Sequence, residues 1–175
     1  MEDNLAKFLT TGVLGSLARG MSLAQVERVL GPPDPGFVIR DRKTREPALW
    51  QYGSLEVCFS DGVVDAIIVE TYGETPDLPA AVKIHDMPMD LAEFQKYLER
   101  AGISCRIDDR RANIQIELVT GDDNTVTTIF DLDSHALRAI SSSQYSIHGN
   151  LLSPDEARAK GVLPASVRPT GNGTG

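Results

Sequence analysis

Two short stretches of the chain place histidine beside aspartate, a combination used by general bases and by many metal sites. His85 precedes Asp86, and His135 follows the run Asp131-Leu132-Asp133. Imidazole titrates near neutral pH, so a histidine held by a carboxylate can accept a proton. A serine hydrolase would also need a G-x-S-x-G turn, which the sequence lacks. Hydrolase chemistry in the second half of the chain is therefore an alternative interpretation only.

No metal or cofactor motif accompanies these histidines. Asp122, Asp123 and Asn124 offer oxygen ligands, but the loop lacks the alternating acids, central glycine and terminal glutamate of an EF-hand. Cys58 and Cys105 belong to no C-x-x-C pair, so no zinc site is expected, and spacing alone leaves their pairing open. The glycines form neither a dinucleotide fingerprint nor a P-loop. We expect no cofactor and no metal.

The chain is acidic, with 25 Asp and Glu against 17 Lys and Arg and a net charge of −8. Affinity for a phosphate backbone comes mainly from Lys and Arg, so this balance argues against a nucleic-acid partner. One segment is dense in cations, and we expect it to be a solvated loop: Arg40, Asp41, Arg42, Lys43, Arg45 and Glu46. The overall charge favours a basic protein as partner.

Length and hydropathy are those of an ordinary globular chain. A chain of 175 residues suffices for one compact body or for two small fused halves. The longest apolar run is too short to cross a bilayer. The acidic start MEDNLAKFLTTG lacks the basic region and apolar core of a secretory signal. We therefore expect a cytoplasmic protein with no membrane partner.

The first elements are predicted to be two helices. Apolar residues recur at helical spacing over residues 4–18. Residues 22–30 form a second helix with firm ends, because Ser22 is placed as N-cap and Gln25 completes a capping box. Gly31 can take the left-handed conformation that ends a helix, and two prolines follow it. This helix is too short to be stable alone, so it must dock on a sheet.

Strands are predicted to follow. Residues 37–40 suggest one short strand within a loop rich in proline and charge. Apolar residues then alternate over 55–60, which predicts a half-buried strand. Asp61-Gly62 is a strong hairpin signal, so the chain should return as a partner strand over 63–72.

The second half repeats this order. In residues 89–102, Asp90 is placed as N-cap and Gly102 as the stop, and Met89 to Phe94 align position by position with Met21 to Val26. Internal duplication and independently arising helix caps explain this parallel equally well. Further strands are predicted at 104–108, 114–119 and 125–131, and a short helix begins after Ser153.

These elements predict an α+β fold in which helices pack on an antiparallel sheet, arranged as two tandem helix-plus-sheet repeats if the duplication is real. The residues after the last helix should be disordered. The expected units are 1–73 for the first helix-helix-strand unit, 74–80 for a linker, 81–152 for the second helix-strand unit, and 153–175 for a short helix and tail.

One core should join the two units. In the first unit it is predicted to contain Leu23, Val26, Leu30, Leu55, Val57 and Phe59. In the second it should contain Leu91, Phe94, Leu98, Ile116, Leu118, Ile129 and Ile140.

The stretch GMSLAQVERVLGPPD, followed by WQYGSLEVCFSDG, resembles the SmpA/OmlA-like and β-lactamase-inhibitor-protein-like domains over residues 20–70. That resemblance implies a small helix-helix-sheet unit whose function is to bind another protein. Members act as enzyme inhibitors, as assembly lipoproteins or as immunity-like proteins. The chain is therefore expected to be a non-enzymatic bacterial binding module, an immunity or inhibitor protein that occludes a toxin or enzyme. The alternatives are the hydrolase above and a structural protein that acts as a homodimer.

A partner is expected on the sheet face that the helices leave uncovered. Trp50 and Tyr52 share one strand face, where they would be core residues or aromatic anchors for a partner. Acids in the hairpin near residue 122 would steer a basic partner. The predicted contact residues are Trp50, Tyr52, Glu56, Ser60, Gln115, Glu117, Asp122 and Asp123.

Overall fold

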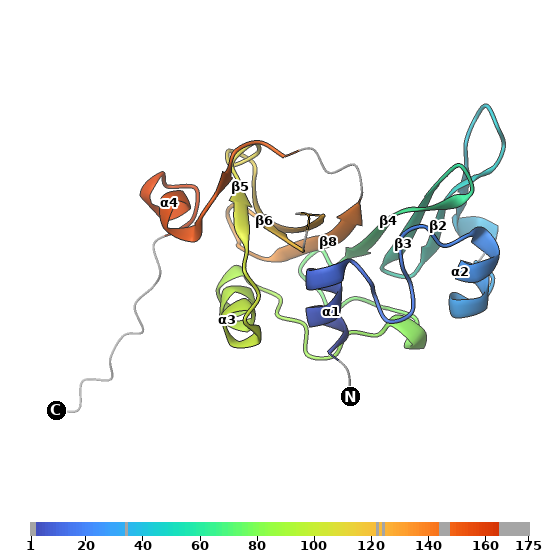
Figure 1. Cartoon of the computed structure of the whole chain (residues 1–175), viewed down its shortest axis with the longest axis horizontal. Coiled ribbons are helices and arrows are strands. Elements are labelled where there is room, and N and C mark those ends of the chain that lie inside the picture. Colours follow the sequence, from blue (N-terminus) through green and yellow to red (C-terminus); the bar gives the residue numbers. More distant parts are fainter. Residues whose placement is uncertain (1–2, 34, 122, 124, 144–147, 165–175) are drawn as a thin grey trace.

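A nine-stranded antiparallel sheet forms the centre of the fold (Figure 1). The structure is a computed structural model that describes residues 3–33, 35–121, 123, 125–143 and 148–164. The strands, in spatial order, are β1 (Val38–Arg40), β2 (Pro47–Tyr52), β3 (Leu55–Ser60), β4 (Val63–Glu70), β8 (Leu137–Ser143), β7 (Val126–Asp131), β6 (Gln115–Thr120), β5 (Arg106–Asp108) and β9 (Leu151–Leu152). Two meanders, β1 to β4 and β5 to β8, meet where β4 pairs with β8. The predicted α+β class with an antiparallel sheet is confirmed.

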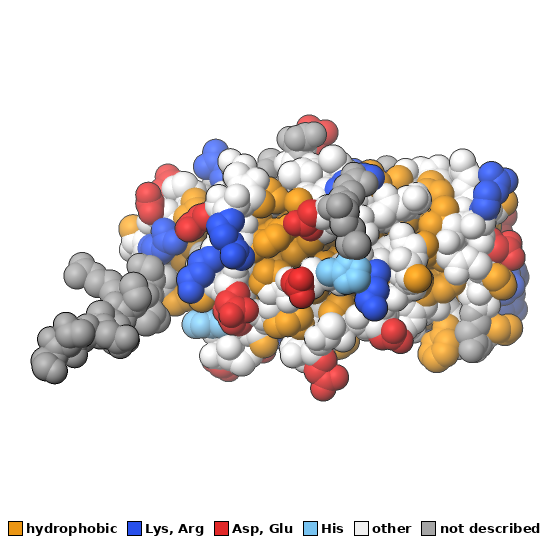
Figure 2. Space-filling view, turned by 90° about the horizontal axis from the view of Figure 1, so that it is seen from below, with side chains coloured by type: hydrophobic (Ala, Val, Ile, Leu, Met, Phe, Trp, Pro, Cys, Tyr) orange, Lys and Arg blue, Asp and Glu red, His pale blue; other side chains and the backbone are white. Residues whose placement is uncertain are grey.

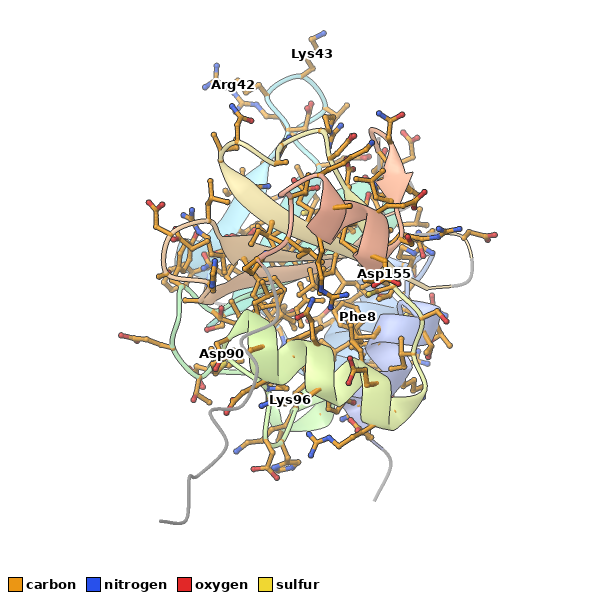
Figure 3. All side chains as sticks on the ribbon, turned by 90° about the vertical axis from the view of Figure 1, so that its left-hand side faces the viewer. Phe8, Arg42, Lys43, Asp90, Lys96 and Asp155 are labelled. Atoms are coloured by element: carbon orange, nitrogen blue, oxygen red, sulfur yellow. The ribbon has the colours of Figure 1, made fainter. Side chains whose placement is uncertain are left out.

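Three helices lie on the same side of this sheet (Figures 1 and 3). They are α1 (Asn4–Thr11), α2 (Leu23–Leu30) and α3 (Leu91–Ala101). A fourth helix, α4 (Pro154–Ala159), lies beside β5, and the 3-10 turns are η1 (Pro35–Phe37) and η2 (Ala80–Val82). Seen from the helix side, charged groups of both signs surround a central area of hydrophobic atoms (Figure 2). Among the described residues, no helix is both long and apolar enough to span a membrane.

The predicted starts of α2 and α3 are confirmed, and Gly31 ends α2 as predicted but with φ of 82° and ψ of 176°, not in the left-handed helical conformation. The Ser22 hydroxyl accepts the Gln25 N–H at 3.4 Å, and the Gln25 side chain accepts the Ser22 N–H at 2.8 Å, which completes the capping box of α2. Gly31 follows as the C-cap. At α3, the Asp90 carboxylate accepts the Glu93 N–H at 2.9 Å. Local chemistry therefore fixes where both helices begin.

The first helix is shorter than the predicted 4–18. It ends at Thr11 because Gly12 takes the left-handed conformation, with φ of 71°. Leu14 and Leu17 then form a tight bridge, and both side chains are fully buried. The apolar spacing that suggested a longer helix thus belongs partly to a turn that packs into the core.

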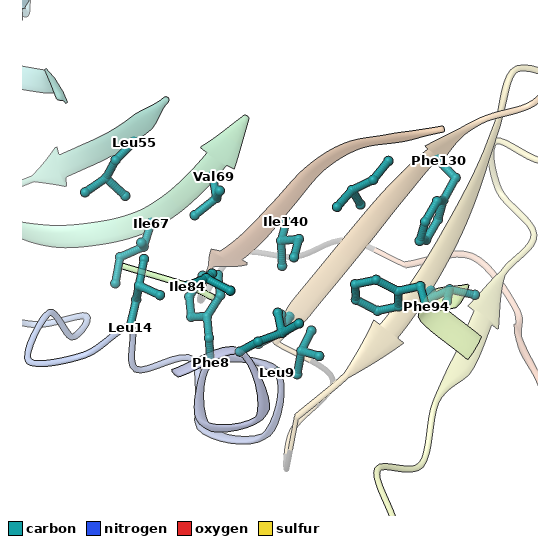
Figure 4. Close-up of a cluster of buried hydrophobic side chains, with 14 of the residues drawn as sticks. Phe8, Leu9, Leu14, Leu55, Ile67, Val69, Ile84, Phe94, Phe130 and Ile140 are labelled. Carbon is teal, nitrogen blue, oxygen red and sulfur yellow. The ribbon is translucent and has the colours of Figure 1, made fainter. Parts of the chain in front are cut away.

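One cluster of buried side chains joins helices and sheet (Figure 4). Within it, the rings of Phe94 and Phe130 meet edge to face, with centroids 5.4 Å apart. Leu23 and Leu30 pack against the cluster but are only partly buried. The predicted core residues that are buried are Val26, Leu55, Val57, Phe59, Leu91, Phe94, Leu98, Ile116, Leu118 and Ile140.

Ile129 was wrongly assigned to this core. It pairs with Glu117 across β6 and β7 and lies on the opposite face of the sheet from Phe130. Residues 127 and 129 of a strand share a face, so Ile129 belongs with Thr127.

The junctions between helix and sheet are alike in the two halves. The Val64 N–H donates to the Met21 carbonyl at 2.8 Å, and the Leu137 N–H donates to the Met89 carbonyl at 2.8 Å. Each contact lies beside the N-cap of α2 or α3. The same likeness extends to the N-cap bridges Ser22 to Val63 and Asp90 to Ala136, and to the strand bulges beside Phe59 and Phe130.

The structure contains strands that the sequence did not predict. β8 lies at the centre of the sheet, between β4 and β7, and β9 extends its far edge. Strand β2 begins at Pro47, within the predicted loop. The end of the tail that was expected to be disordered, residues 165–175, lies outside the described residues.

Candidate functional site

The register of the sheet separates its two faces. Side chains such as Val57 and Ile67 point toward the helices, and their strand neighbours point away. Glu56, Ser60 and Gln115, predicted as contact residues, lie on the face away from the helices. Ser60 is exposed, and Glu56 and Gln115 are half-buried.

Glu117 lies on that same face but is not available to a partner. Its exposed fraction is 3%, so the prediction that it forms part of an open surface is wrong. Gln115 Nε2 donates to its carboxylate, and Arg111 Nε lies 3.9 Å away. In register it faces Asp108, over which the chain after β8 returns. This part of the sheet is covered by the protein itself.

Asp108 and His148 form a polar pair at this covered end. The buried Asp108 carboxylate accepts the N–H groups of Arg110 at 2.9 Å and Gly149 at 3.0 Å, and its second oxygen lies 3.0 Å from His148 Nδ1. Burial alone would raise the pKa of Asp108, but these hydrogen bonds outweigh it and lower the pKa. Through these contacts, Asp108 of β5 holds the segment that leads into β9.

The histidines chosen from the sequence do not build a site. The Asp131 carboxylate accepts the N–H groups of Asp133 at 3.0 Å and Ser134 at 2.9 Å, and His135 follows with a φ of 57°. The hydrogen bonds from Ser134 are the main reason that the pKa of Asp131 is low. His85 is exposed on the segment before α3. Asp131 therefore shapes a turn, as aspartates commonly do.

Trp50 and Tyr52 belong to the core side of the sheet. Trp50 is buried and meets Phe59 edge to face, with ring centroids 4.9 Å apart. The Tyr52 hydroxyl donates to the Gly31 carbonyl at 3.0 Å. Burial, and then the charge of Glu27, raises the pKa of Tyr52 to about 12. The assignment of these two aromatics to a partner surface is wrong, because the register of β2 turns both toward α2.

The remaining predicted residues are less informative. Asp122 lies outside the described residues, and Asp123 is exposed in the turn between β6 and β7. Cys58 and Cys105 are both free thiols.

The far side of the first meander carries neighbouring rows of residues, most of them exposed or half-buried. An apolar row crosses four strands from Ile39, which is 59% exposed, to Ala66, which is 9% exposed. A second row runs beside it through Glu56. We call this surface the docking face and define it by Ile39, Leu49, Cys58, Ala66, Gln51, Glu56, Ile68 and Glu70.

The carboxylate of Glu56 is the charged group that lies within the docking face between Gln51 and Ile68. Partial burial, and then the charge of Glu70, raises the pKa of Glu56. The Tyr72 hydroxyl donates to Glu70 at 3.0 Å, whereas the carboxylate of Glu56 has no hydrogen bond or ion pair to any described residue. Burial raises the pKa of Cys58 beside it to about 11, and Glu56 and Asp65 add to that effect. The face thus holds negative charge that lacks a cation.

A hollow of about 350 Å³ adjoins the docking face at the end of β4. Tyr72 stands at its border, 68% exposed and with a φ of 47°. The acidic residues around the hollow are Glu70, Glu74 and Asp77. An incoming basic side chain would meet carboxylates and an aromatic ring here, the groups that hold cations in proteins.

We found no family model that matches the chain, and no curated protein or solved structure that matches it. The geometry of the docking face therefore carries the functional proposal.

Proposed function

We propose that this protein is a non-enzymatic binding module that covers a basic surface of another protein with its docking face. The observation that carries this proposal is Glu56, a half-buried carboxylate with a raised pKa and no cation among the described residues. A carboxylate removed from water without a partner costs free energy. A Lys or Arg from another protein would recover that cost, while the apolar row from Ile39 to Ala66 supplies contact area.

The partner class follows from the charge. A net charge of −8 accelerates the encounter with a basic protein and disfavours nucleic acid. A basic toxin or enzyme fits this description, and the resemblance to inhibitor and assembly domains over residues 20–70 supports the same role. We therefore propose a bacterial, cytoplasmic immunity or inhibitor protein that occludes its target.

Affinity capture with matched variants tests this proposal. Immobilised wild-type protein, Glu56→Lys and Glu99→Lys are exposed to a lysate of the source organism, and retained proteins are identified by mass spectrometry. Glu99 is exposed on α3, so its variant repeats the charge change on the helix side. We expect a basic protein that the wild type and Glu99→Lys retain and Glu56→Lys loses. Equal retention by all three would reject the docking face.

A second candidate, a hydrolase, is favoured only by the Asp108 and His148 pair. A buried carboxylate that orients an imidazole is the arrangement of a general base. Replacing His148 with Gln in a folded protein should then abolish any ester or amide hydrolysis shown by the wild type. A wild type without hydrolytic activity against such substrates would reject this candidate.

We also propose that the helices pack on the sheet as parts of two tandem repeats. The support is the common junction, in which the carbonyls of Met21 and Met89 accept equivalent strand N–H groups. Cutting the chain at an inserted protease site within residues 74–80 should leave two pieces that remain associated through β4 and β8. Prompt loss of secondary structure after that cut would contradict two repeat units.

A further inference from the structure

We propose that two copies of the chain associate through the docking face, with a basic arm of each copy placed on the acidic end of the other. The basic arm is the turn between β1 and β2, residues 40–46. This inference rests on the proposed function, because it names a second copy as the resting occupant that another protein must displace. The association would thereby regulate the binding site.

The basic arm projects from the body of the protein. Arg42 and Lys43 lie at its tip and point away from the sheet (Figure 3). The structure gives these two side chains no ion pair among the described residues. All of the cations of the arm are exposed: Arg40, Arg42, Lys43 and Arg45.

The arm is a turn held by its own hydrogen bonds, one of which runs from Arg40 Nη1 to the Arg45 carbonyl at 3.2 Å. Asp41 accepts the N–H groups of Lys43 and Thr44, both at 2.8 Å, so its exposed carboxylate is held against the backbone of the turn. Arg45 takes a left-handed conformation with φ of 64°, and its N–H donates to the Asp41 carbonyl at 3.0 Å. The arm is thus a formed turn whose four cations outnumber its two acids, Asp41 and Glu46, so it carries net positive charge.

The opposite end of the same strands is acidic. Strand β2 begins at Pro47 beside the arm and ends at the turn of Gly53 and Ser54. The Asp77 N–H donates to the Ser54 hydroxyl at 3.0 Å, which ties the acidic hollow to that turn. The acids at this end are Glu56, Glu70, Glu74 and Asp77. A six-residue strand spans about 20 Å, so the arm and these acids lie about that far apart, at opposite ends of β2.

This order of charges suits a symmetric pair. A two-fold interface uses the same patch on both copies, so the patch must be complementary to itself. An axis through the apolar row at Leu49 and Cys58 brings the arm of each copy to the acidic end of the other. It also buries the exposed Ile39 against apolar neighbours. Docking in the other orientation would oppose arm to arm, and like charges would prevent it.

Sedimentation of the full chain tests this inference. We expect the wild type to show a concentration-dependent monomer–dimer equilibrium that weakens in high salt. Arg42→Glu with Lys43→Glu should weaken dimerisation at least about tenfold, and Glu70→Lys with Glu74→Lys should do the same, because each breaks both reciprocal contacts. The control, Lys96→Glu with Arg100→Glu, changes charge on α3 and should leave the dimer intact.

Mixing the two defective variants gives the decisive result. An acidic arm would then meet a basic face, and a basic arm an acidic face, so a mixed dimer should form with near wild-type affinity. That rescue also shows that both variants are folded. A monomeric wild type, a dimer that survives both pairs of substitutions, or a mixture that stays monomeric would each overturn the inference. A monomeric wild type that still captures a basic protein would leave the proposed function standing.

Discussion

The effect of Glu56 on thermal stability shows whether this residue serves binding or supports the fold. Its folded pKa is raised, so protonation stabilises the protein as pH falls through that value, and the ionised carboxylate at neutral pH destabilises it. Glu56→Gln should therefore raise the melting temperature at pH 7 and have little effect near pH 4. It should also weaken partner binding. Thermal melts at both pH values check this, and a lower melting temperature at pH 7 would show that Glu56 supports the fold.

Asp108 should behave in the opposite way. Its folded pKa is lowered, so its contribution to stability is present above the unfolded value, about 3.9, and is lost as pH falls through the folded value. Asp108→Asn should cost about 3 kcal/mol at pH 7, because it removes the charge that two N–H groups and His148 contact.

Denaturant unfolding at several pH values measures that loss. The wild type should lose stability below about pH 4, and Asp108→Asn should show a smaller loss, because other carboxylates with lowered pKa values, Asp131 among them, remain. Asp123→Asn is the control, since Asp123 is exposed. Equal pH profiles for the wild type and Asp108→Asn would contradict the stabilising role assigned to the ionised Asp108 carboxylate.

Single residues were the hardest features to predict from sequence. His135 was chosen because an aspartate lies nearby in the chain, yet that aspartate shapes a turn. The aspartate and histidine that are in contact, Asp108 and His148, are 40 residues apart in the chain, so no local sequence pattern predicts their contact. Glu56 was placed correctly because alternation along one strand fixes its face. For Trp50 the sequence left core and partner surface as alternatives, because its face depends on the pairing of β2; the structure places it in the core.

Helices α2 and α3 were predicted closely because their ends depend on neighbours in sequence. Ser22 and Asp90 act on N–H groups three residues away. Strand β8 was missed because its central place depends on pairing with β4, which is remote in sequence. The overlong first helix shows the same limit, since the burial of Leu14 and Leu17 in a turn is a tertiary effect.

Val26 and Phe94 test the anchoring of these helices. Each is the fourth residue of its helix and has no exposed surface. Val26→Ala and Phe94→Ala should each cost on the order of 2 to 4 kcal/mol of unfolding free energy. Glu99→Ala, an exposed change on α3, should stay within about 0.5 kcal/mol. Equilibrium unfolding in urea measures all three, and a negligible loss for Phe94→Ala would refute its core placement.

At the scale of the whole molecule, the fold class and the acidic charge could be read from sequence and the distribution of charge could not. Composition gives a net charge of −8. Only the structure shows that the basic arm and the acids near Glu70 lie at opposite ends of β2. It also shows that the second meander covers its own far side, which leaves the first as the docking face.

The most direct test of binding through that docking face uses the two cysteine thiols of the chain. Cys58 lies on the docking face, whereas Cys105 lies between α3 and α4, and both are free. Alkylation of the two is followed by mass spectrometry, with and without the captured partner, at a concentration at which sedimentation shows the free protein to be monomeric, and their rates are compared as a ratio. The proposed function predicts that the partner slows modification of Cys58 and leaves Cys105 unchanged. An unchanged rate at Cys58 in a saturated complex would contradict binding through the docking face.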